Sequence, residues 1–168
     1  MSAEPSFTRR RASAYVRLFL KVPRLVYVGP IAELLRWRCV MLLTTRGRRT
    51  GIPRTNGVSF MPSGDHFVVF SGWGVSSNWY RNIRANPAVR IKVGGREMNA
   101  MARLVEDPER RRQLMLQMAA RSSRCGPPTF LRPLIKLTGV FDYQAEIDMA
   151  VAAGRTLPVI EIFPTGTP

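Results

Sequence analysis

The sequence has few of the residues that build metal sites. Its 168 residues include two cysteines, Cys39 and Cys125, and a single histidine, His66. One histidine and two distant cysteines cannot supply the four ligands of a structural zinc site, so no metal is predicted. The histidine follows the turn-forming pair Gly64-Asp65, and we expect it to be a solvent-exposed turn residue. So few cysteines favour two reduced thiols in a cytoplasmic protein.

Long apolar runs are absent as well. No stretch of 18 uncharged apolar residues exists, which argues against a membrane-spanning helix. The start Thr8-Arg9-Arg10-Arg11 resembles a twin-arginine export signal, but Arg17, Lys21 and Arg24 interrupt the apolar stretch behind it. No small-x-small cleavage site follows, so we expect no export.

Acidic residues and lysines are scarce. The chain has 26 Lys and Arg against 11 Asp and Glu, and just three of the basic residues are lysines. Residues 1–54 hold twelve basic and two acidic residues. Arginine binds phosphate and carboxylate groups through two parallel hydrogen bonds. A GC-rich coding bias is an alternative explanation for the arginines, but it does not explain their concentration in one third. We therefore predict that the first third faces an anion.

The apolar pattern predicts one α+β domain behind a basic arm. Residues 1–12 are expected to be a mobile arm, followed by a short amphipathic helix that ends at Pro23. Further helices are expected at 31–37, 78–84, 107–121 and 143–152, and strands at 38–45, 55–61, 66–71, 88–93, 96–105 and 157–163. Short turns join the strands, which predicts a barrel of five or six mostly antiparallel strands with flanking helices. Residues 1–24 form the arm and 25–168 the barrel domain.

The segment from Thr44 to Arg54 has the composition of an anion-binding loop. Gly47 and Gly51 can adopt positive φ and let backbone N–H groups converge, while Arg48 and Arg49 supply charge. The spacing is neither that of a Walker loop nor that of a Rossmann fingerprint. A solvated basic hairpin is the equally weighted alternative.

A second segment, residues 71–82, joins a predicted strand to a predicted helix. Two glycines flank Trp73, and Ser77 or Asn78 is expected to cap the helix. Unpaired N–H groups at a helix start favour a negative or polar ligand edge, and Trp73 can stack on a ring. Packing of the helix on the sheet is the alternative role for Trp79 and Tyr80.

Together the two segments resemble the family of deazaflavin-dependent nitroreductases and quinone reductases. The resemblance rests on Leu-Leu-Thr-Thr-x-Gly-Arg-Arg-Thr-Gly-x-Pro-Arg at 42–54 and Val-Val-Phe-Ser-Gly-x-Gly at 68–74. It continues with Trp-Tyr-x-Asn-x-x-Ala-Asn-Pro at 79–87, Asp-Tyr-Gln at 142–144 and Arg-x-x-Pro-Val-Ile at 155–160. It covers about residues 25–164. It implies a split β-barrel, similar to FMN-binding proteins, that uses the deazaflavin coenzyme F420.

The resemblance also implies roles for individual residues. Arg48, Arg49 and Thr50 resemble residues that hold the phosphate and acidic tail of the coenzyme. The ring and ribityl regions would lie against Arg54, Asn56, Ser71, Gly72, Trp73 and Trp79. Tyr143 resembles a catalytic tyrosine that closes over the acceptor. Gly57, Ser59 and Trp73 depart from the family pattern, and these departures concern the acceptor more than the coenzyme.

The implied activity is hydride transfer from reduced coenzyme F420 to a quinone, a nitro compound or a similar oxidised acceptor. One alternative is a non-catalytic split-barrel module that binds a lipid or coenzyme at an anionic membrane surface. Another is an FMN-dependent split-barrel oxidoreductase. Stacked aromatics spaced for bases are not visible, so nucleic acid is not a predicted partner. Residues 1–24 are predicted to dock on the inner face of the cell membrane, or else to pack on the barrel.

Overall fold

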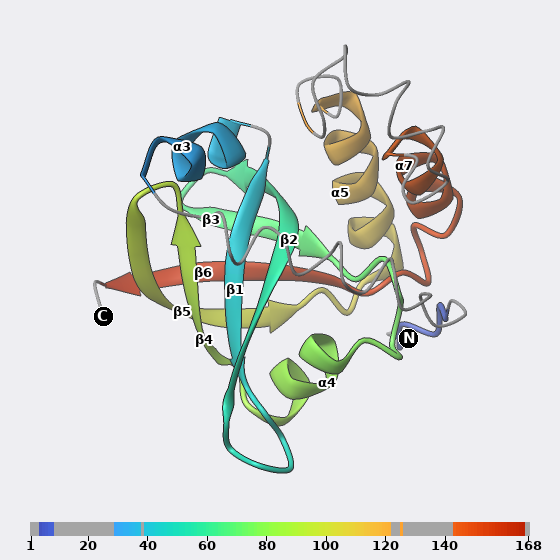
Figure 1. Ribbon diagram of the computed structural model, residues 1–168. Helices are drawn as coiled ribbons and strands as arrows, with labels where there is room; N and C mark the ends of the chain where they lie inside the picture. The colour runs from blue at the N-terminus through green and yellow to red at the C-terminus, as the bar shows by residue number, and fades with distance from the viewer. Residues whose placement is uncertain (1–3, 9–28, 38, 122–124, 126–142, 167–168) are drawn as a thin grey trace.

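The computed structural model describes residues 4–8, 29–37, 39–121, 125 and 143–166 of the chain. Six antiparallel strands close into a barrel in the order β1-β2-β3-β6-β5-β4 (Figure 1). They are β1 (Val40–Arg46), β2 (Pro53–Ser63), β3 (His66–Phe70), β4 (Ala88–Val93), β5 (Arg96–Leu104) and β6 (Val159–Gly166). The predicted split barrel of five or six mostly antiparallel strands is confirmed.

Alternation along the strands builds the barrel interior. In β1 the side chains of Met41, Leu43 and Thr45 are all fully buried. The register pairs Leu43 with Asn56 on one side and with Ile91 on the other, so β1 joins β2 to β4 and closes the barrel. Pairs of neighbouring strands are joined by tight turns such as Gly94-Gly95. The predicted boundaries of the strands are correct to within a few residues.

The helices cover the two ends and one side of the barrel. Helix α4 (Asn78–Ala85) and the β1–β2 loop lie at one end, and α3 (Gly29–Trp37) lies at the opposite end (Figure 1). Helices α5 (Pro108–Arg121) and α7 (Tyr143–Ala152) pack together beside the barrel. Asp107 caps α5 as predicted, because its carboxylate accepts a 2.9 Å hydrogen bond from the backbone N–H of Arg110. None of the described helices is long and apolar enough to cross a membrane.

A buried arginine ties α5 to the chain before β6. Arg111 is fully buried, and its guanidinium donates hydrogen bonds to the backbone carbonyls of Val105, Glu106 and Arg155. Burial lowers the pKa of the Arg111 guanidinium because the charged form loses its hydration. The three carbonyls compensate for that loss, so the residue holds α5 in place rather than binding a ligand.

Residues 4–8 are not a mobile arm, which corrects part of the sequence prediction. The N–H groups of Ser6 and Phe7 both bond to the carbonyl of Thr156 at 3.1 Å, and the N–H of Val75 bonds to the carbonyl of Phe7 at 2.9 Å. The Phe7 side chain packs against the apolar cluster between the barrel and α5. A half-buried aromatic side chain in a polar, basic stretch thus anchors this segment to the barrel. The predicted amphipathic helix that ends at Pro23 lies outside the described residues.

The expectation of two reduced cysteines is also wrong. Cys39 and Cys125 form a disulfide, with their Cα atoms 5.2 Å apart. Cys39 directly precedes β1, and Cys125 follows α5, so the packing of α5 beside the barrel brings together two residues 86 positions apart. No local pattern in the sequence predicts that contact.

His66 is not a solvent-exposed turn residue. It begins β3, and its side chain is 15% exposed. The pairing of β3 with β6 places Phe163 beside it, and the two rings stack with centroids 4.7 Å apart. Its Nδ1 lies 3.1 Å from the carboxylate of Asp65. The turn itself, Gly64-Asp65, is where the sequence predicted it.

Candidate functional site

A basic cavity of about 440 Å³ lies between the β1–β2 loop and the first turn of α4. Six of the residues predicted to bind a coenzyme line it: Arg48, Arg49, Thr50, Arg54, Asn56 and Trp79. Gly47, Asn78 and Asn82 complete its described wall. The structure therefore brings together, in one place, residues that the sequence spreads over two segments.

Strand geometry explains why β2 contributes to this cavity. Arg54 and Asn56 are two positions apart, and residues two apart in a strand face the same side of the sheet. Arg54 pairs with Thr45 and Asn56 pairs with Leu43 across the β1–β2 ladder. The two side chains thus extend the wall of the cavity away from the loop and along the barrel.

The β1–β2 loop uses its own backbone donors internally. Gly51 has φ of +69° and its N–H bonds to the carbonyl of Gly47 at 2.7 Å, while the N–H of Gly47 bonds to the carbonyl of Ile52 at 3.0 Å. The N–H of Ile52 bonds to the hydroxyl of Thr50 at 3.4 Å. These N–H groups do not converge on an anion as the sequence predicted. Side chains of the loop can recognise an anion instead, and the Thr50 hydroxyl, which accepts from Ile52, keeps its own hydrogen to donate.

Arg48 is held in place by two asparagines of α4. The buried Asn82 accepts hydrogen bonds at its Oδ1 from the Arg48 backbone N–H at 3.2 Å and from Arg48 Nη1 at 3.3 Å. Its Nδ2 donates to the hydroxyl of Thr45 at 3.1 Å. Asn78, one turn earlier, accepts a 3.4 Å hydrogen bond from the same Nη1. Arg48 therefore approaches the cavity with much of its rotamer freedom already removed, which lowers the entropic cost of binding a ligand.

The electrostatics of the cavity favour an anion. Three guanidinium groups, those of Arg48, Arg49 and Arg54, line it, and no carboxylate does so among the described residues. The first turn of α4 adds the partial positive charge of a helix N-terminus. Since arginine binds phosphate and carboxylate groups in a bidentate manner, the arrangement can hold a phosphate together with a further acidic group.

The loop between β3 and α4 lies off this cavity. Ser71 is fully buried, and its hydroxyl donates to the carbonyl of Gly74 at 2.8 Å and shares a 2.6 Å hydrogen bond with the hydroxyl of Ser77. Ser77 occupies the predicted cap position of α4, but its side chain makes no capping hydrogen bond. Gly72 and Trp73 are half-buried. Through the start of α4, this loop sets the position of Asn78 and Trp79.

Tyr143 is the first residue of α7, and its side chain is not among those described. The predicted catalytic residue is thus not placed relative to the cavity. A larger cavity at the opposite end of the barrel holds none of the predicted site residues.

Sequence reasoning missed the two asparagines. The sequence predicts Asn78 as a possible helix cap and Asn82 as part of the family motif, and neither as a partner of Arg48. A signal was available, because residues four apart lie on the same face of a helix and both are amides that can accept from a guanidinium.

Comparison with known proteins agrees with this site. The sequence model of the F420H(2)-dependent quinone reductase family matches residues 16–124, more than half of the chain. An F420H(2)-dependent quinone reductase of Mycobacterium tuberculosis (strain ATCC 25618 / H37Rv) is 35% identical to the chain over 74 residues. That stretch is 41% of this chain and 50% of the relative, so the chain spans about half the length of the curated relatives it matches.

Solved structures share the fold. The haem storage protein HutZ of Vibrio cholerae superposes with a TM-score of 0.52 at 19% identity, covering 81% of this chain and 89% of that one. A conserved hypothetical protein of Mycobacterium tuberculosis gives a TM-score of 0.51 at 14% identity, covering 96% and 88%. At such identities the likeness shows the barrel architecture alone.

Proposed function

Because the chain belongs to the F420H(2)-dependent quinone reductase family, we propose that it is an oxidoreductase that takes a hydride from reduced coenzyme F420. The hydride acceptor is a quinone, a nitro compound or a similar oxidised organic molecule. The observation that carries the proposal is the cavity lined by Arg48, Arg49 and Arg54. It lies where the family resemblance assigns the phosphate and acidic tail of the coenzyme.

The residues present fit that group. A phosphate and a chain of carboxylates need several cations and few competing acids, and the described wall has three arginines and no carboxylate. Thr50 adds a hydroxyl that can donate to the phosphate. Asn82 fixes the Arg48 guanidinium through hydrogen bonds, so the anchor does not have to be ordered when the coenzyme binds.

When bound, coenzyme F420 supplies the hydride, and the protein orients the acceptor and excludes water. Trp79 lines the same cavity and also packs against the barrel core, which makes it a rigid wall for a flat ring. We assign Ser71, Gly72 and Trp73 to the support of that wall. Tyr143 is proposed as the group that donates a hydrogen bond or proton to the acceptor oxygen as negative charge develops there.

The proposal extends to the surface on which the enzyme acts. Residues 1–24 carry the basic side chains of Arg9, Arg10 and Arg11, which favour anionic lipid. Helix α3 also presents Ile31, Leu34 and Trp37 to solvent, with 44%, 54% and 73% of their surfaces exposed. The apolar face of α3 and the basic residues of the arm together support a peripheral position on the inner side of the cell membrane, where a lipid-soluble quinone is available. The cytoplasmic location is part of this proposal.

A single fluorescence experiment tests the function. Adding oxidised coenzyme F420 to the purified chain should change the coenzyme's fluorescence in a saturable manner. Adding menadione to the complex with reduced coenzyme should then regenerate the oxidised form at a rate proportional to enzyme concentration. Binding without turnover of menadione or a nitro compound would favour the non-catalytic module. Absence of binding, together with a yellow purified protein, would favour FMN.

A further inference from the structure

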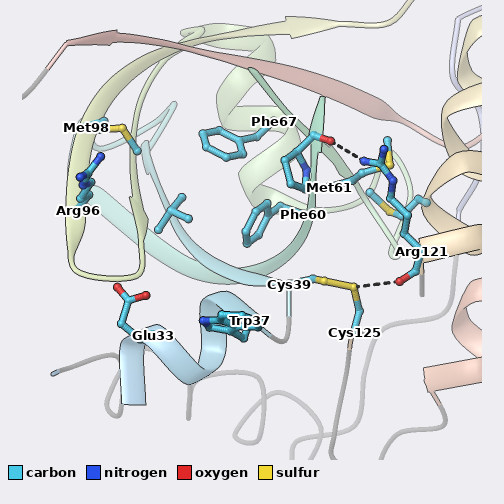
Figure 2. Close-up of a pocket in the computed structure, with 13 residues that line it drawn as sticks. Glu33, Trp37, Cys39, Phe60, Met61, Phe67, Arg96, Met98, Arg121 and Cys125 are labelled. Atoms are coloured by element: carbon cyan, nitrogen blue, oxygen red, sulfur yellow. Dashed lines mark hydrogen bonds between the residues drawn. A yellow bond between two sulfur atoms is a disulfide. The ribbon is translucent and has the colours of Figure 1, made fainter. Parts of the chain in front are cut away.

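A second cavity, of about 1030 Å³, opens at the end of the barrel opposite the basic one. It lies among α3, the starts of β1 and β5, and the end of β2, with the Cys39–Cys125 disulfide in its wall (Figure 2). The two cavities lie at opposite ends of β1, a strand of seven residues, which separates them by roughly 20 Å. A molecule in this cavity therefore cannot exchange a hydride directly with a ring in the basic cavity.

The wall of the second cavity is mostly apolar. Its aromatic and thioether side chains belong to Trp37, Phe60, Phe67, Met61, Met98 and Met118. Phe60 and Phe67 meet edge to face with centroids 5.5 Å apart, and so form a rigid floor. Methionines adapt to ligands of different shape, because their side chains are unbranched and polarisable. A volume of this size accommodates an organic molecule rather than an ion.

The mouth of the cavity carries a net positive charge, and one of its arginine side chains has no partner among the described residues. Arg96 and Arg121 lie on opposite sides of it, and Glu33 lies below Arg96 (Figure 2). Glu33 already accepts a 2.9 Å hydrogen bond from the N–H of Gly95, and Arg121 donates a 2.8 Å hydrogen bond to the carbonyl of Pro62. The guanidinium of Arg96, at the exposed start of β5, makes no hydrogen bond or ion pair with any described residue. It is therefore available to bind an acidic group.

We propose that this cavity is a second binding site, for an amphipathic anion with an apolar body and one acidic group. The apolar body lies on Phe60, Phe67 and the methionines, and the acidic group pairs with Arg96. The site stands on its own residues and does not depend on the proposed reductase activity.

The test uses the full chain and the fluorescent probe 1-anilinonaphthalene-8-sulfonate, which combines an apolar ring system with one sulfonate. The probe should bind with a stoichiometry of one per chain, and its fluorescence should increase on binding. Decanoate should displace it. Arg96→Gln should weaken both ligands roughly tenfold, since a charged hydrogen bond is lost. Met98→Trp, which fills the cavity, should abolish binding. 1-Decanol, with the same body and no charge, should compete at least tenfold less well than decanoate.

Arg103→Gln is the matched control, because it makes the same change on β5 outside the cavity, where Arg103 lies over the ring of Phe163. It should change the affinities less than twofold. Arg96 is exposed, so its variant decides the outcome even if Met98→Trp does not fold. The proposal is overturned if the wild type does not bind the probe, if decanol competes as well as decanoate, or if both arginine variants behave alike.

Discussion

The side chain of Asn82 accepts hydrogen bonds from both the backbone and the guanidinium of Arg48, although the two residues are 34 positions apart. This pair connects α4 to the β1–β2 loop. It explains how a glycine-rich basic loop, which would otherwise sample many conformations, presents one arginine to the cavity in a fixed position.

Asn82→Ala should weaken both coenzyme binding and the fold. The substitution removes the acceptor of the Arg48 N–H and the donor to the buried Thr45 hydroxyl, and we expect a loss of about 1–3 kcal/mol in the free energy of unfolding. Urea denaturation measures the stability, and a fluorescence titration with coenzyme F420 should show an affinity about tenfold lower. Asn78→Ala is the control, because it removes a single 3.4 Å hydrogen bond at an exposed residue. Equal effects of the two changes would contradict the role given to Asn82.

Gly74→Ala should release residues 4–8 from the barrel. Gly74 has φ of +65°, and a Cβ there would collide with the backbone carbonyl of Phe7. We expect a loss of stability of about 1–3 kcal/mol from strain and lost packing. Hydrogen exchange should show the amides of Ser6 and Phe7 becoming unprotected.

Gly64→Ala provides the matched control. Gly64 has a similar φ of +61°, but a Cβ there would meet nothing within 4 Å. Its substitution should cost about 1–2 kcal/mol from backbone strain alone. The amides of Ser6 and Phe7 should stay protected, and their exposure in both variants would refute the contact with Phe7 as the cause.

Removal of the disulfide should destabilise the protein without altering the basic cavity. Replacing Cys39 and Cys125 by serine opens a covalent loop between residues 86 positions apart, and about 2–4 kcal/mol of stability should be lost. Urea denaturation of the wild type with dithiothreitol should give the same lowered free energy of unfolding as the double variant. Dithiothreitol should not change the free energy of unfolding of the double variant. Two free thiols in the non-reduced, denatured wild type would rule the disulfide out.

Neutralising the start of the arm should weaken membrane association. Changing Arg9, Arg10 and Arg11 to glutamine should make the free energy of binding to phosphatidylglycerol vesicles less favourable by about 1 kcal/mol per residue. Deletion of the whole arm is a poorer test, because it also removes the packing of Phe7.

Three exposed arginines outside the arm, Arg90 on β4, Arg103 on β5 and Arg112 on α5, give a control with the same loss of charge. Their change to glutamine should affect sedimentation with the vesicles much less. If both triple variants sediment alike, or if the wild type ignores the vesicles, the arm has no role in docking.

The sequence allowed much of the barrel and the composition of the basic cavity to be predicted. Alternating apolar residues mark the strands, and turn pairs such as Gly64-Asp65 and Gly94-Gly95 separate them, so strand boundaries follow from local chemistry. The segment with Arg48, Arg49 and Thr50 was identified because phosphate recognition needs those residue types close together.

Contacts between distant segments were not predictable in this way. Three such contacts depend on how the barrel closes: the disulfide, the stacking of His66 on Phe163, and the hydrogen bonds between Asn82 and Arg48. No local sequence pattern encodes them. The polar composition of the first residues also concealed the one aromatic, Phe7, that docks them.

The measurement that bears most directly on the central claim is the affinity of the Arg48→Ala/Arg49→Ala variant for coenzyme F420. Both arginines face the proposed site of the phosphate and acidic tail, so the double change should weaken binding by about 2–4 kcal/mol, and wild-type binding should fall as salt rises. The deazaflavin ring with its ribityl chain but no phosphate should bind the variant and the wild type equally. An Arg90→Ala/Arg103→Ala variant should bind the coenzyme as the wild type does. Unchanged affinity of the Arg48→Ala/Arg49→Ala variant for the full coenzyme would contradict the account.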